Sequence, residues 1–427
     1  MSVHALVFAE PAEAEPTLLG VPVLERLLRT LVRSGVTHAV LISSASEALG
    51  VGLAGDDWAR AGLAISTRSR SAGVPQVADA LAAWPEEAER VLVFPSLGVF
   101  DARIVKALVR ASDAVALVDS STEEQSMAGP SIARTSRSLL CGPALLERSF
   151  LASRRGDLAI VLAEAIDEGA LGVVDVREIP RYIPSMRRTL RPFWLPAPTG
   201  ALELNRAEAI VVEAAQKKAL DFPAYVHAPI ENAVVRAICR TGVTPNQVSL
   251  LGNVVAWIGT ALLATGQLGW GILLALVVGV LDGVDGKLAR MKIETTPSGK
   301  LEHWFDTLFE VSWAVALAWY LARSGARPDA WWLLLLLLGA EAVDGLAKGA
   351  IILRYGRQID DVAPFDRAVR LVGGRRNVYV WIMAVGIALG AAGNAFALVA
   401  CWEALTALVH VGRVAWLVGR RVPVAAD

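Results

Sequence analysis

This sequence has few cysteines and almost no net charge. The three cysteines among 427 residues, Cys141, Cys239 and Cys401, are widely spaced. That spacing fits neither a disulfide framework nor a zinc motif, and it suits a reducing cytoplasmic environment. The 41 basic and 42 acidic residues leave a formal net charge of −1. This balance is not the profile of a nucleic-acid-binding protein, so no nucleic-acid partner is predicted.

The N-terminal residues also lack a secretion signal. The opening segment reads MSVHALVFAE. It has no basic region followed by a long apolar core, and we therefore predict no signal peptide.

Apolar residues are abundant, at 54% of the chain, and they concentrate after residue 245. A length of 427 residues allows two or three domains. Runs of about 20 residues can span about 30 Å of hydrocarbon. Six such runs cover 246–266, 269–290, 300–323, 330–352, 377–394 and 396–418. The region 246–420 is therefore predicted to be a polytopic α-helical membrane domain of six transmembrane helices.

The distribution of Arg and Lys predicts the orientation of these runs. Basic residues gather before the first run, in the turn 290–300, throughout 353–376, and after the last run. The turns 267–268 and 393–395 carry none. By the positive-inside rule we expect an inner (cytoplasmic) membrane location, with both termini and the turn after the second run in the cytoplasm.

The stretch 281–310 concentrates acidic residues at the ends of two of these runs. It reads LDGVDGKLARMKIETTPSGKLEHWFDTLFE. Asp282 and Asp285 are three residues apart, and Glu302 and Asp306 are four apart, so each pair lies on one helical face. Carboxylates inside a membrane domain need a cation, a partner or a water-filled cavity. Four of them make a hard-oxygen site suited to Mg²⁺, Mn²⁺ or Ca²⁺.

Asp282 to Arg290 match every fixed position in the first half of a family signature, D-x2-D-G-x2-A-R-x8-G-x3-D-x3-D. On these residues the C-terminal region resembles the CDP-alcohol phosphotransferases, also called CDP-alcohol phosphatidyltransferases. Packing offers an alternative, in which Arg290 and Lys287 neutralise the carboxylates and the segment serves helix contacts alone.

The second half of the signature departs from the family pattern. Counting from Gly299, the expected aspartates fall on His303 and Thr307. A loop one residue shorter places them on Glu302 and Asp306, and we prefer this register because it keeps two carboxylates one helical turn apart. His303 remains the alternative third ligand.

The resemblance implies a set of site residues. Two Mg²⁺ or Mn²⁺ ions would be held by Asp282, Asp285, Glu302 and Asp306, with Asp306 also the catalytic base. A Thr-Pro-Asn segment before the first membrane helix is similar in the family, and here it is Thr244-Pro245-Asn246. The implied contacts to the CDP group are Asn246, Gly286, Ala289 and Arg290.

The segment 353–376 is the richest cationic patch, and its GGRRN sequence resembles the inositol-phosphate-using branch of the family. Arginine binds phosphate with two parallel hydrogen bonds. The residues predicted to bind the acceptor's phosphate are Lys348, Arg354, Arg357, Arg367, Arg375 and Arg376. Alternatively, the arginines anchor the chain at the membrane, and Lys348 neutralises Glu341 and Asp344. We interpret Glu403, His410 and Arg413, in the last run, as helix-packing groups.

Residues 1–195 alternate short apolar runs with amphipathic ones. Predicted strands cover 5–8, 38–42, 63–66, 91–94 and 114–118, and predicted helices include 21–34, 76–82 and 102–111. This alternation is typical of a soluble, Rossmann-like α/β domain with a mostly parallel sheet.

The order of these pieces resembles the sugar-phosphate nucleotidyltransferases. Similar domains occur in fusions of inositol-phosphate cytidylyltransferase with di-myo-inositol-phosphate-phosphate synthase. However, the loop 9–16 has three glutamates and neither glycine nor a basic residue, although a triphosphate needs both. Pro95-Ser96-Leu97-Gly98 stands where a metal-binding aspartate is expected, and Asp101 alone is nearby. We predict an inactive nucleotidyltransferase-like domain; an active divergent enzyme and an unrelated α/β domain are the alternatives.

The segment 196–245 joins the two parts. We interpret it as a linker with an amphipathic helix at the membrane interface, although an ordinary interdomain helix is the alternative.

The predicted activity moves a substituted phosphate from a CDP-alcohol, of the CDP-diacylglycerol or CDP-inositol type, to a hydroxyl acceptor such as a polyol phosphate, and releases CMP. The lipid bilayer is an expected partner, and homodimerisation would fit the family. The first alternative is a bifunctional enzyme that also makes its own CDP-alcohol. Alternatives of another class are a catalytically dead membrane scaffold and a cation transporter.

Overall fold

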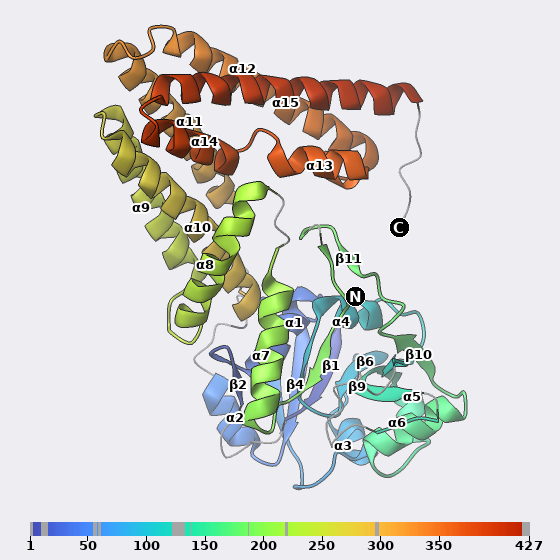
Figure 1. Ribbon diagram of the computed structural model, residues 1–427. Coiled ribbons are helices and arrows are strands. Elements are labelled where there is room, and N and C mark those ends of the chain that lie inside the picture. Colours follow the sequence, from blue (N-terminus) through green and yellow to red (C-terminus); the bar gives the residue numbers. More distant parts are fainter. Residues whose placement is uncertain are drawn as a thin grey trace. The chain divides into compact units, whose positions relative to one another are not determined.

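The computed structural model describes residues 3–9, 16–53, 58, 61–121, 133–136, 138–186, 188–217, 221–294 and 299–420. The chain forms two compact units (Figure 1). The first comprises Met1–Gln216 with Met291–Ile293, and the second comprises Lys217–Arg290 with Glu294–Asp427. The division falls inside the segment 196–245, so that helix α7 (Ala201–Ala215) belongs to the first unit and helix α8 (Phe222–Ile238) to the second.

The first unit is built on a seven-stranded sheet with the order β10-β8-β9-β6-β1-β4-β5. Its strands are β1 (His4–Phe8), β4 (His38–Ser43), β5 (Ala64–Ser69), β6 (Arg90–Phe94), β8 (Val115–Asp119), β9 (Leu139–Glu147) and β10 (Gly172–Asp175). Neighbouring strands are parallel except where β9 runs antiparallel between β6 and β8. All five predicted strands are therefore confirmed, within a mixed sheet.

Two strands of this sheet were not predicted from the sequence, β9 and the edge strand β10. Strand β9 is the longer of the two. It contains Gly142-Pro143, a dipeptide that normally marks a turn. In the structure Gly142 has φ +107°, and the register with β8 shifts between Ala116 and Val118. A bulge accommodates the proline, which cannot donate a ladder hydrogen bond.

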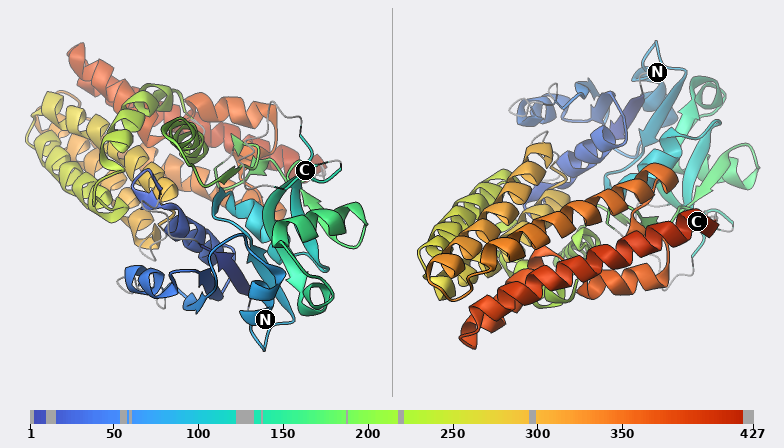
Figure 2. Two further views of the ribbon diagram at one scale, coloured as in Figure 1. Left: turned by 90° about the horizontal axis from the view of Figure 1, so that it is seen from below. Right: turned by 90° about the horizontal axis from the view of Figure 1, so that it is seen from above.

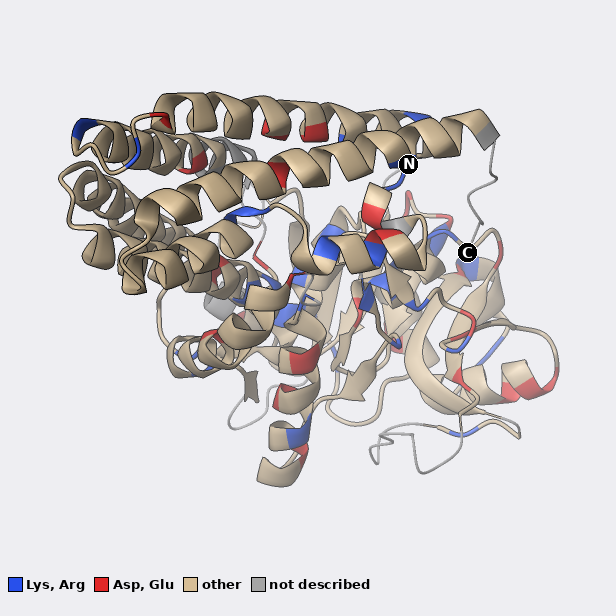
Figure 3. Cartoon of the chain, turned by 45° about the horizontal axis from the view of Figure 1, so that its top comes forward, with Lys and Arg blue, Asp and Glu red and all other residues tan. Residues whose placement is uncertain are grey.

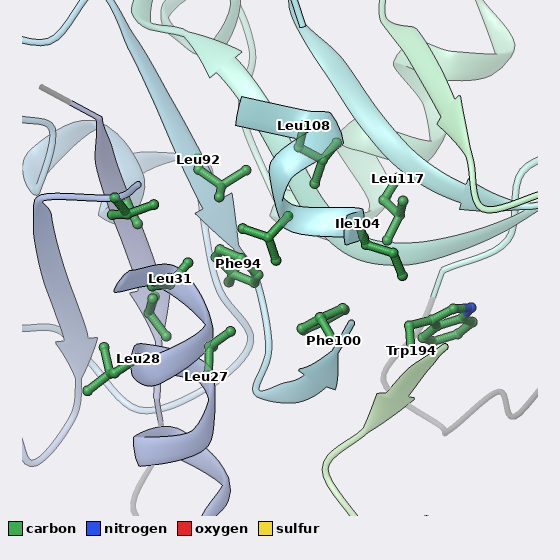
Figure 4. Packing of buried hydrophobic residues seen from close by; sticks show 14 of the residues in the cluster. Leu27, Leu28, Leu31, Leu92, Phe94, Phe100, Ile104, Leu108, Leu117 and Trp194 are labelled. Atoms are coloured by element: carbon green, nitrogen blue, oxygen red, sulfur yellow. The ribbon is translucent and has the colours of Figure 1, made fainter. Parts of the chain in front are cut away.

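Helices cover both faces of this sheet. One face carries α1 (Val23–Arg33) and α4 (Ala102–Val109), and the other carries α3 (Val77–Ala82), α5 (Arg148–Ala152) and α6 (Leu158–Asp167). Successive residues of β1 point to opposite sides: Ala5 and Val7 join the core under α1, and Leu6 and Phe8 join the other core. Figure 4 shows the first core, with leucines of α1 and α4 packed about Phe94 and Phe100. The predicted α/β class is confirmed.

Shorter elements complete the first unit. They are β2 (Thr17–Leu18), β3 (Val21–Pro22), α2 (Ser46–Leu53), β7 (Gly98–Phe100), β11 (Tyr182–Ile183), β12 (Arg188–Thr189) and β13 (Trp194–Pro196).

The second unit is helical, and its long helices are mostly uncharged (Figure 3). After α8 it contains α9 (Pro245–Ala264), α10 (Leu268–Lys292), α11 (Gly299–Arg323), α12 (Ala330–Tyr355), η2 (Ile359–Asp361), α13 (Pro364–Val372), α14 (Arg376–Ala388) and α15 (Ala392–Arg420). Helices α12 and α15 run side by side, as both views of Figure 2 show. A core that includes Trp313, Leu317, Met383 and Phe396 joins α9 to α12, α14 and α15.

Within the described residues, four helices have the length and composition of membrane spans: α9, α10, α12 and α15. The coarser prediction of a helical membrane protein is supported, whereas the count of six spans is not confirmed. Helix α11 matches the predicted run 300–323, but the structure leaves its first side chains undescribed. Helix α14 has 13 residues, which at 1.5 Å per residue is shorter than the hydrocarbon layer.

The predicted boundary between the last two runs, at Gly393-Asn394, was wrong. Helix α14 ends at Ala388, and Gly390 adopts φ +69°, a left-handed conformation that ends helices and favours glycine. Gly393 instead lies inside α15. There a Cβ would lie 3.0 Å from the carbonyl oxygen of Ala326, so this glycine permits a close approach of the loop between α11 and α12.

Candidate active site

The first half of the carboxylate motif lies on one continuous helix, α10, as predicted. Asp282 and Asp285 both line a pocket in the second unit. Asp285 is buried, at 7% exposure, and its Oδ2 accepts a 2.6 Å hydrogen bond from the hydroxyl of Ser249 on α9. The rest of the lining comprises Val248, Gly252, Asn253, Ala256, Val278, Leu281 and Phe309. The pocket therefore combines two carboxylates and the polar side chains of Ser249 and Asn253 with an otherwise apolar lining.

Gly286 and Arg290 contact each other one turn apart on α10. A Cβ at Gly286 would lie 3.2 Å from Nη1 of Arg290, so the guanidinium folds back over the glycine. Because Gly286 has no side chain, the guanidinium of Arg290 has room beside the acidic pocket. Ala289 follows on the same helix and is half-buried.

Arg376, the first residue of α14, joins the cationic segment to this motif. Its Nη2 lies 2.7 Å from Oδ2 of Asp282, and its Nε lies 3.7 Å from Oε1 of Glu310 on α11. One predicted phosphate-binding arginine thus meets one predicted metal ligand across helices that are almost one hundred residues apart in the chain.

The remaining predicted phosphate-binding residues spread over several elements. Lys348 forms an ion pair with Asp344 within α12. Asp344 also contacts His410 of α15. Arg354 is exposed beside the ring of Tyr355. The others are Arg357 after α12, Arg367 on α13 and Arg375 at the start of α14. Phosphate binding by these residues stays a prediction.

The polar residues of the last run pair across helices. Glu403 accepts a hydrogen bond from Tyr379, and His410 contacts Asp344. Arg413 donates two hydrogen bonds to Asp366, at 2.7 and 3.0 Å. This agrees with their interpretation as helix-packing groups.

The second half of the motif is on α11, but Glu302, His303 and Asp306 lie outside the residues whose side chains are described. Among the described side chains, no three of the His, Cys, Asp or Glu type gather as metal ligands. The choice between Glu302 and His303 therefore stays a prediction.

Helix α9 begins where the Thr-Pro-Asn segment predicts. The amide of Gln247 donates to the hydroxyl of Thr244 at 3.3 Å, and the amide of Thr244 donates to the side chain of Gln247 at 3.0 Å. This capping box confirms the predicted helix start. Asn246 is exposed in the first turn.

Sequence reasoning missed Ser249 and Asn253, which line the pocket. Together with Asn246 they occupy positions i, i+3 and i+7 of an apolar run, and so share one helical face. A polar stripe along a predicted membrane span was the signal that could have found them.

In the first unit, Asp101 is the acidic residue near Pro95-Ser96-Leu97-Gly98, and it has a structural role. Asp101 caps α4 by accepting from the amide of Arg103 at 2.9 Å, and it also pairs with the guanidinium of Arg103 at 2.6 Å. Gly98 lies against β13, since a Cβ there would be 2.7 Å from the carbonyl oxygen of Leu195. Strand β13 thus covers the place where a metal-binding aspartate was expected. Loop residues 10–15 lie outside the described part of the chain.

Asp119 is a buried carboxylate at the end of β8. Burial opposes its ionisation, but hydrogen bonds from Ser121 and from Nε1 of Trp194 (3.1 Å), together with Arg191 at 3.2 Å, hold its pKa below the ordinary value. Burial, and then Asp119 and Asp175, raise the pKa of the neighbouring Cys141 thiol. These contacts bind β8 to β13.

Long apolar helices and a pocket with two carboxylates indicate that the second unit is a helical membrane domain with an acidic pocket. The CDP-alcohol phosphatidyltransferase family model matches residues 242–409, so the resemblance seen in the motif is confirmed for that part of the chain.

Three known proteins show how far the similarity extends. The chain is 31% identical over 162 residues to a bifunctional IPC transferase and DIPP synthase of Rubrobacter xylanophilus. The match covers 36% of this chain and 33% of the relative, so it spans about a third of that protein.

Two solved structures are also similar. A phosphatidylinositol phosphate synthase from Mycobacterium tuberculosis with CDP-DAG bound is 20% identical, with 44% of this chain and 94% of that chain covered and a TM-score of 0.36. The inositol-1-phosphate CTP transferase from T. maritima is 13% identical, with 49% and 96% covered and a TM-score of 0.35. At these scores neither likeness establishes a shared fold.

Proposed function

We propose that this protein transfers a substituted phosphate from a CDP-alcohol to a hydroxyl acceptor and releases CMP. The observation that carries this proposal is the ion pair of Arg376 with Asp282, which lines the pocket, because it joins a predicted phosphate-binding group to a predicted metal ligand. The family match over residues 242–409 supports the same reaction.

The donor set fits a divalent cation. Asp282 and Asp285 offer hard oxygen ligands to one pocket, and Ser249 orients the second of them. Together with Glu302 and Asp306 they would hold two Mg²⁺ or Mn²⁺ ions, whose contribution is to stabilise negative charge on the leaving CMP.

The chain's own residues supply the remaining parts of the reaction. Asp306 accepts the proton of the acceptor hydroxyl. Arg290, whose guanidinium lies over Gly286, binds a phosphate of the CDP group. Asn246 and Ala289 contact the CDP group. The apolar part of the pocket lining limits access of water, which disfavours hydrolysis of the donor.

For the acceptor we favour a polyol phosphate. Arg375 and Arg376 lie side by side at the start of α14, where two guanidinium groups suit one phosphate. Lys348, Arg354, Arg357 and Arg367 are the further candidates. The relative called an IPC transferase and DIPP synthase supports this substrate class. The donor is of the CDP-diacylglycerol or CDP-inositol type.

The first unit, in this proposal, has lost nucleotidyl transfer and serves docking or regulation. The capping role of Asp101 and the cover of Gly98 by β13 support this. The second candidate is a bifunctional enzyme that makes its own CDP-alcohol, which the same relative's name favours. Turnover of CTP with a sugar or polyol phosphate by the full-length protein would distinguish the two, and we expect none.

The membrane arrangement completes the proposal. Domains would cover 1–195, 196–245 and 246–420, with six spans and both termini and the site on the cytoplasmic side. Helix α8 would lie at the membrane interface, where its exposed Phe222, Tyr225 and Ile230 meet lipid. Labelling of single introduced cysteines at the turns 267–268 and 356–358 would give opposite sidedness if this is correct. A homodimer is part of this proposal and would appear in mass photometry.

The decisive assay incubates the purified protein with Mg²⁺ and a panel of CDP-alcohols and acceptors, and measures CMP. Metal-dependent CMP release with acceptor-dependent product supports a transferase. Ion flux in vesicles without CMP release would favour a cation transporter. Absence of both activities would leave a membrane scaffold.

A further inference from the structure

Lys287 lies inside the carboxylate motif, yet its charge is directed away from the motif's acids. Its ammonium is 2.7 Å from Oε2 of Glu231 and 2.8 Å from Oδ1 of Asn232, and it also approaches the carbonyl oxygen of Ala228 at 3.5 Å. All three partners lie on α8. Lys287 is 3% exposed and Glu231 7%, so the pair is almost wholly withdrawn from solvent.

The pair forms on a face of α10 that glycines open to α8. Gly279, Gly283 and Lys287 recur every four residues, and at about 100° per residue their face lies roughly 130° from that of Asp282 and Asp285. A Cβ at Gly279 would lie 3.1 Å from Cε1 of His227. One at Gly283 would overlap the carboxylate of Glu231. Helix α8 therefore contacts the backbone of α10 directly.

Further contacts fix α8 against α14. Trp381 donates from Nε1 to Nε2 of His227 at 3.3 Å, and Asn377 donates to Oδ2 of Asp221 at 3.4 Å. Helix α14 also begins with Arg376, which pairs with Asp282. The position of Glu231 is thus set by the same helices that position the acidic pocket.

These contacts have an electrostatic consequence. A lysine that follows Asp282 and Asp285 within a turn and a half would repel a divalent cation if it faced them. A buried carboxylate on another helix cancels its charge and holds it on a different face.

We propose that Glu231 is a positioning residue for the metal site: it holds the charge of Lys287 on another face of α10, so that this charge does not lie beside Asp282 and Asp285 at the pocket. This inference rests on the proposed function, because it takes the pocket carboxylates as cation ligands.

The test measures Mn²⁺ affinity of the full-length protein by electron paramagnetic resonance, without substrate. Removing the carboxylate in Glu231→Gln leaves Lys287 buried without its charged partner. We expect Mn²⁺ to bind on the order of 10-fold more weakly, the scale typical for groups behind metal ligands. The double variant Glu231→Gln/Lys287→Gln removes the stray charge, and affinity should return to within about 3-fold of wild type.

The matched control is Asp366→Asn, which replaces a buried carboxylate that pairs with half-buried Arg413 elsewhere in the same unit. It should lower thermal stability as Glu231→Gln does, but leave Mn²⁺ affinity unchanged. If Glu231→Gln does not fold, Lys287→Gln alone provides the test: its Mn²⁺ affinity should equal or exceed that of wild type, and a loss contradicts the proposal.

The outcomes separate this inference from the proposed function. Equal Mn²⁺ affinity in wild type and Glu231→Gln overturns the positioning role and leaves the transferase proposal intact. A double variant as weak as the single one also overturns charge sequestration. Wild-type protein that binds Mn²⁺ but releases no CMP from any donor contradicts the proposed function alone. Wild-type protein that binds no Mn²⁺ overturns both.

Discussion

The two units use their carboxylates for different ends. In the first, Asp101 and Asp157 cap helices α4 and α6, and Asp119 bonds Ser121 and Trp194. These groups satisfy backbone and indole N–H donors and stabilise the unit that contains them. In the second, Asp282 and Asp285 line a pocket, and their neighbours come from α9 and α14.

The contrast indicates where chemistry survives. Asp101 and Asp157 accept hydrogen bonds from backbone amides of the helices that they cap, and these bonds use acceptor sites that a cation would need. Asp282 and Asp285 instead line a pocket, where a bound cation can reach their oxygen atoms. The contrast therefore predicts opposite responses to the same change in the two units.

The largest effect is expected at Asp285. Asp285→Asn removes a predicted ligand while keeping the shape, and CMP release should fall on the order of 1000-fold, about 4 kcal/mol of barrier. Asp101→Asn in the first unit should leave the rate within about 2-fold and instead reduce stability by about 1 kcal/mol. Rates of CMP release and thermal unfolding measured on both variants check the comparison, and equal rate losses would break it.

A smaller but still large effect is expected at Gly374, next to the arginines of α14. A Cβ there would overlap the Glu403 carboxylate and lie 2.6 Å from the Tyr379 hydroxyl. Either the segment or the hydrogen-bonded Glu403 and Tyr379 side chains must shift. A displacement of about 1 Å at a substrate-positioning residue costs on the order of 100-fold in rate. Gly374→Ala should act through kcat/KM for the acceptor.

The matched control for this change is Gly412→Ala on α15, where nothing lies within 4 Å of a Cβ. It should leave kcat/KM unchanged and increase helix stability by about 0.5–1 kcal/mol. Similar kinetic losses in the two alanine variants would show that packing in general, rather than the arginine segment, governs the rate.

A moderate effect is expected at Ser249, which the motif does not include. Ser249→Ala removes the 2.6 Å hydrogen bond to Asp285 and should weaken Mn²⁺ binding about 10-fold. Thr260 lies on the same helix as Ser249 and contacts Ser312 of α11 at 3.3 Å. Thr260→Val removes that contact and should not change Mn²⁺ binding. Titration with Mn²⁺ measures both, and unchanged affinity in Ser249→Ala would remove Ser249 from the site.

The smallest effect concerns pH and the first unit. The pKa of Asp119 is lowered in the folded state, so its stabilising contribution is present above its unfolded pKa and is lost as pH falls through the folded one. Strands β8 and β13 should thus lose hydrogen-exchange protection below about pH 4. Asp119→Asn should lower their protection at pH 7 by about 2 kcal/mol and flatten this dependence. A wild-type-like slope in the variant would contradict the assignment.

Local patterns predicted most of the fold. The predicted strands of the first unit are short apolar runs, and its predicted helices repeat apolar residues with a period near four; local sequence displays both patterns directly. The Asp282–Arg290 motif formed on one helix for the same reason. Strand β9 was not predicted because Gly142-Pro143 is a dipeptide typical of turns. Its pairing with β6 and β8 makes a bulged strand favourable there.

Long-range pairs lay beyond the sequence. Nothing local to Arg376 indicates that its partner is Asp282, and nothing local to Lys287 indicates Glu231. Tertiary packing creates both pairs after the helices have formed. The end of α14 was also misplaced, since Gly390 and Gly393 are equally good helix-ending residues in isolation and their contacts alone distinguish them.

The antiparallel strand β9 has a consequence for biosynthesis. Among the described strands it alone joins β8 to the four strands β6, β1, β4 and β5, so β8 stays separate from them until residue 147 has left the ribosome. Until then β6 and β8 each present an unpaired edge, the feature that promotes association between chains. A ribosome that stalls before residue 139 would therefore release a nascent chain prone to aggregate before any membrane helix has been synthesised.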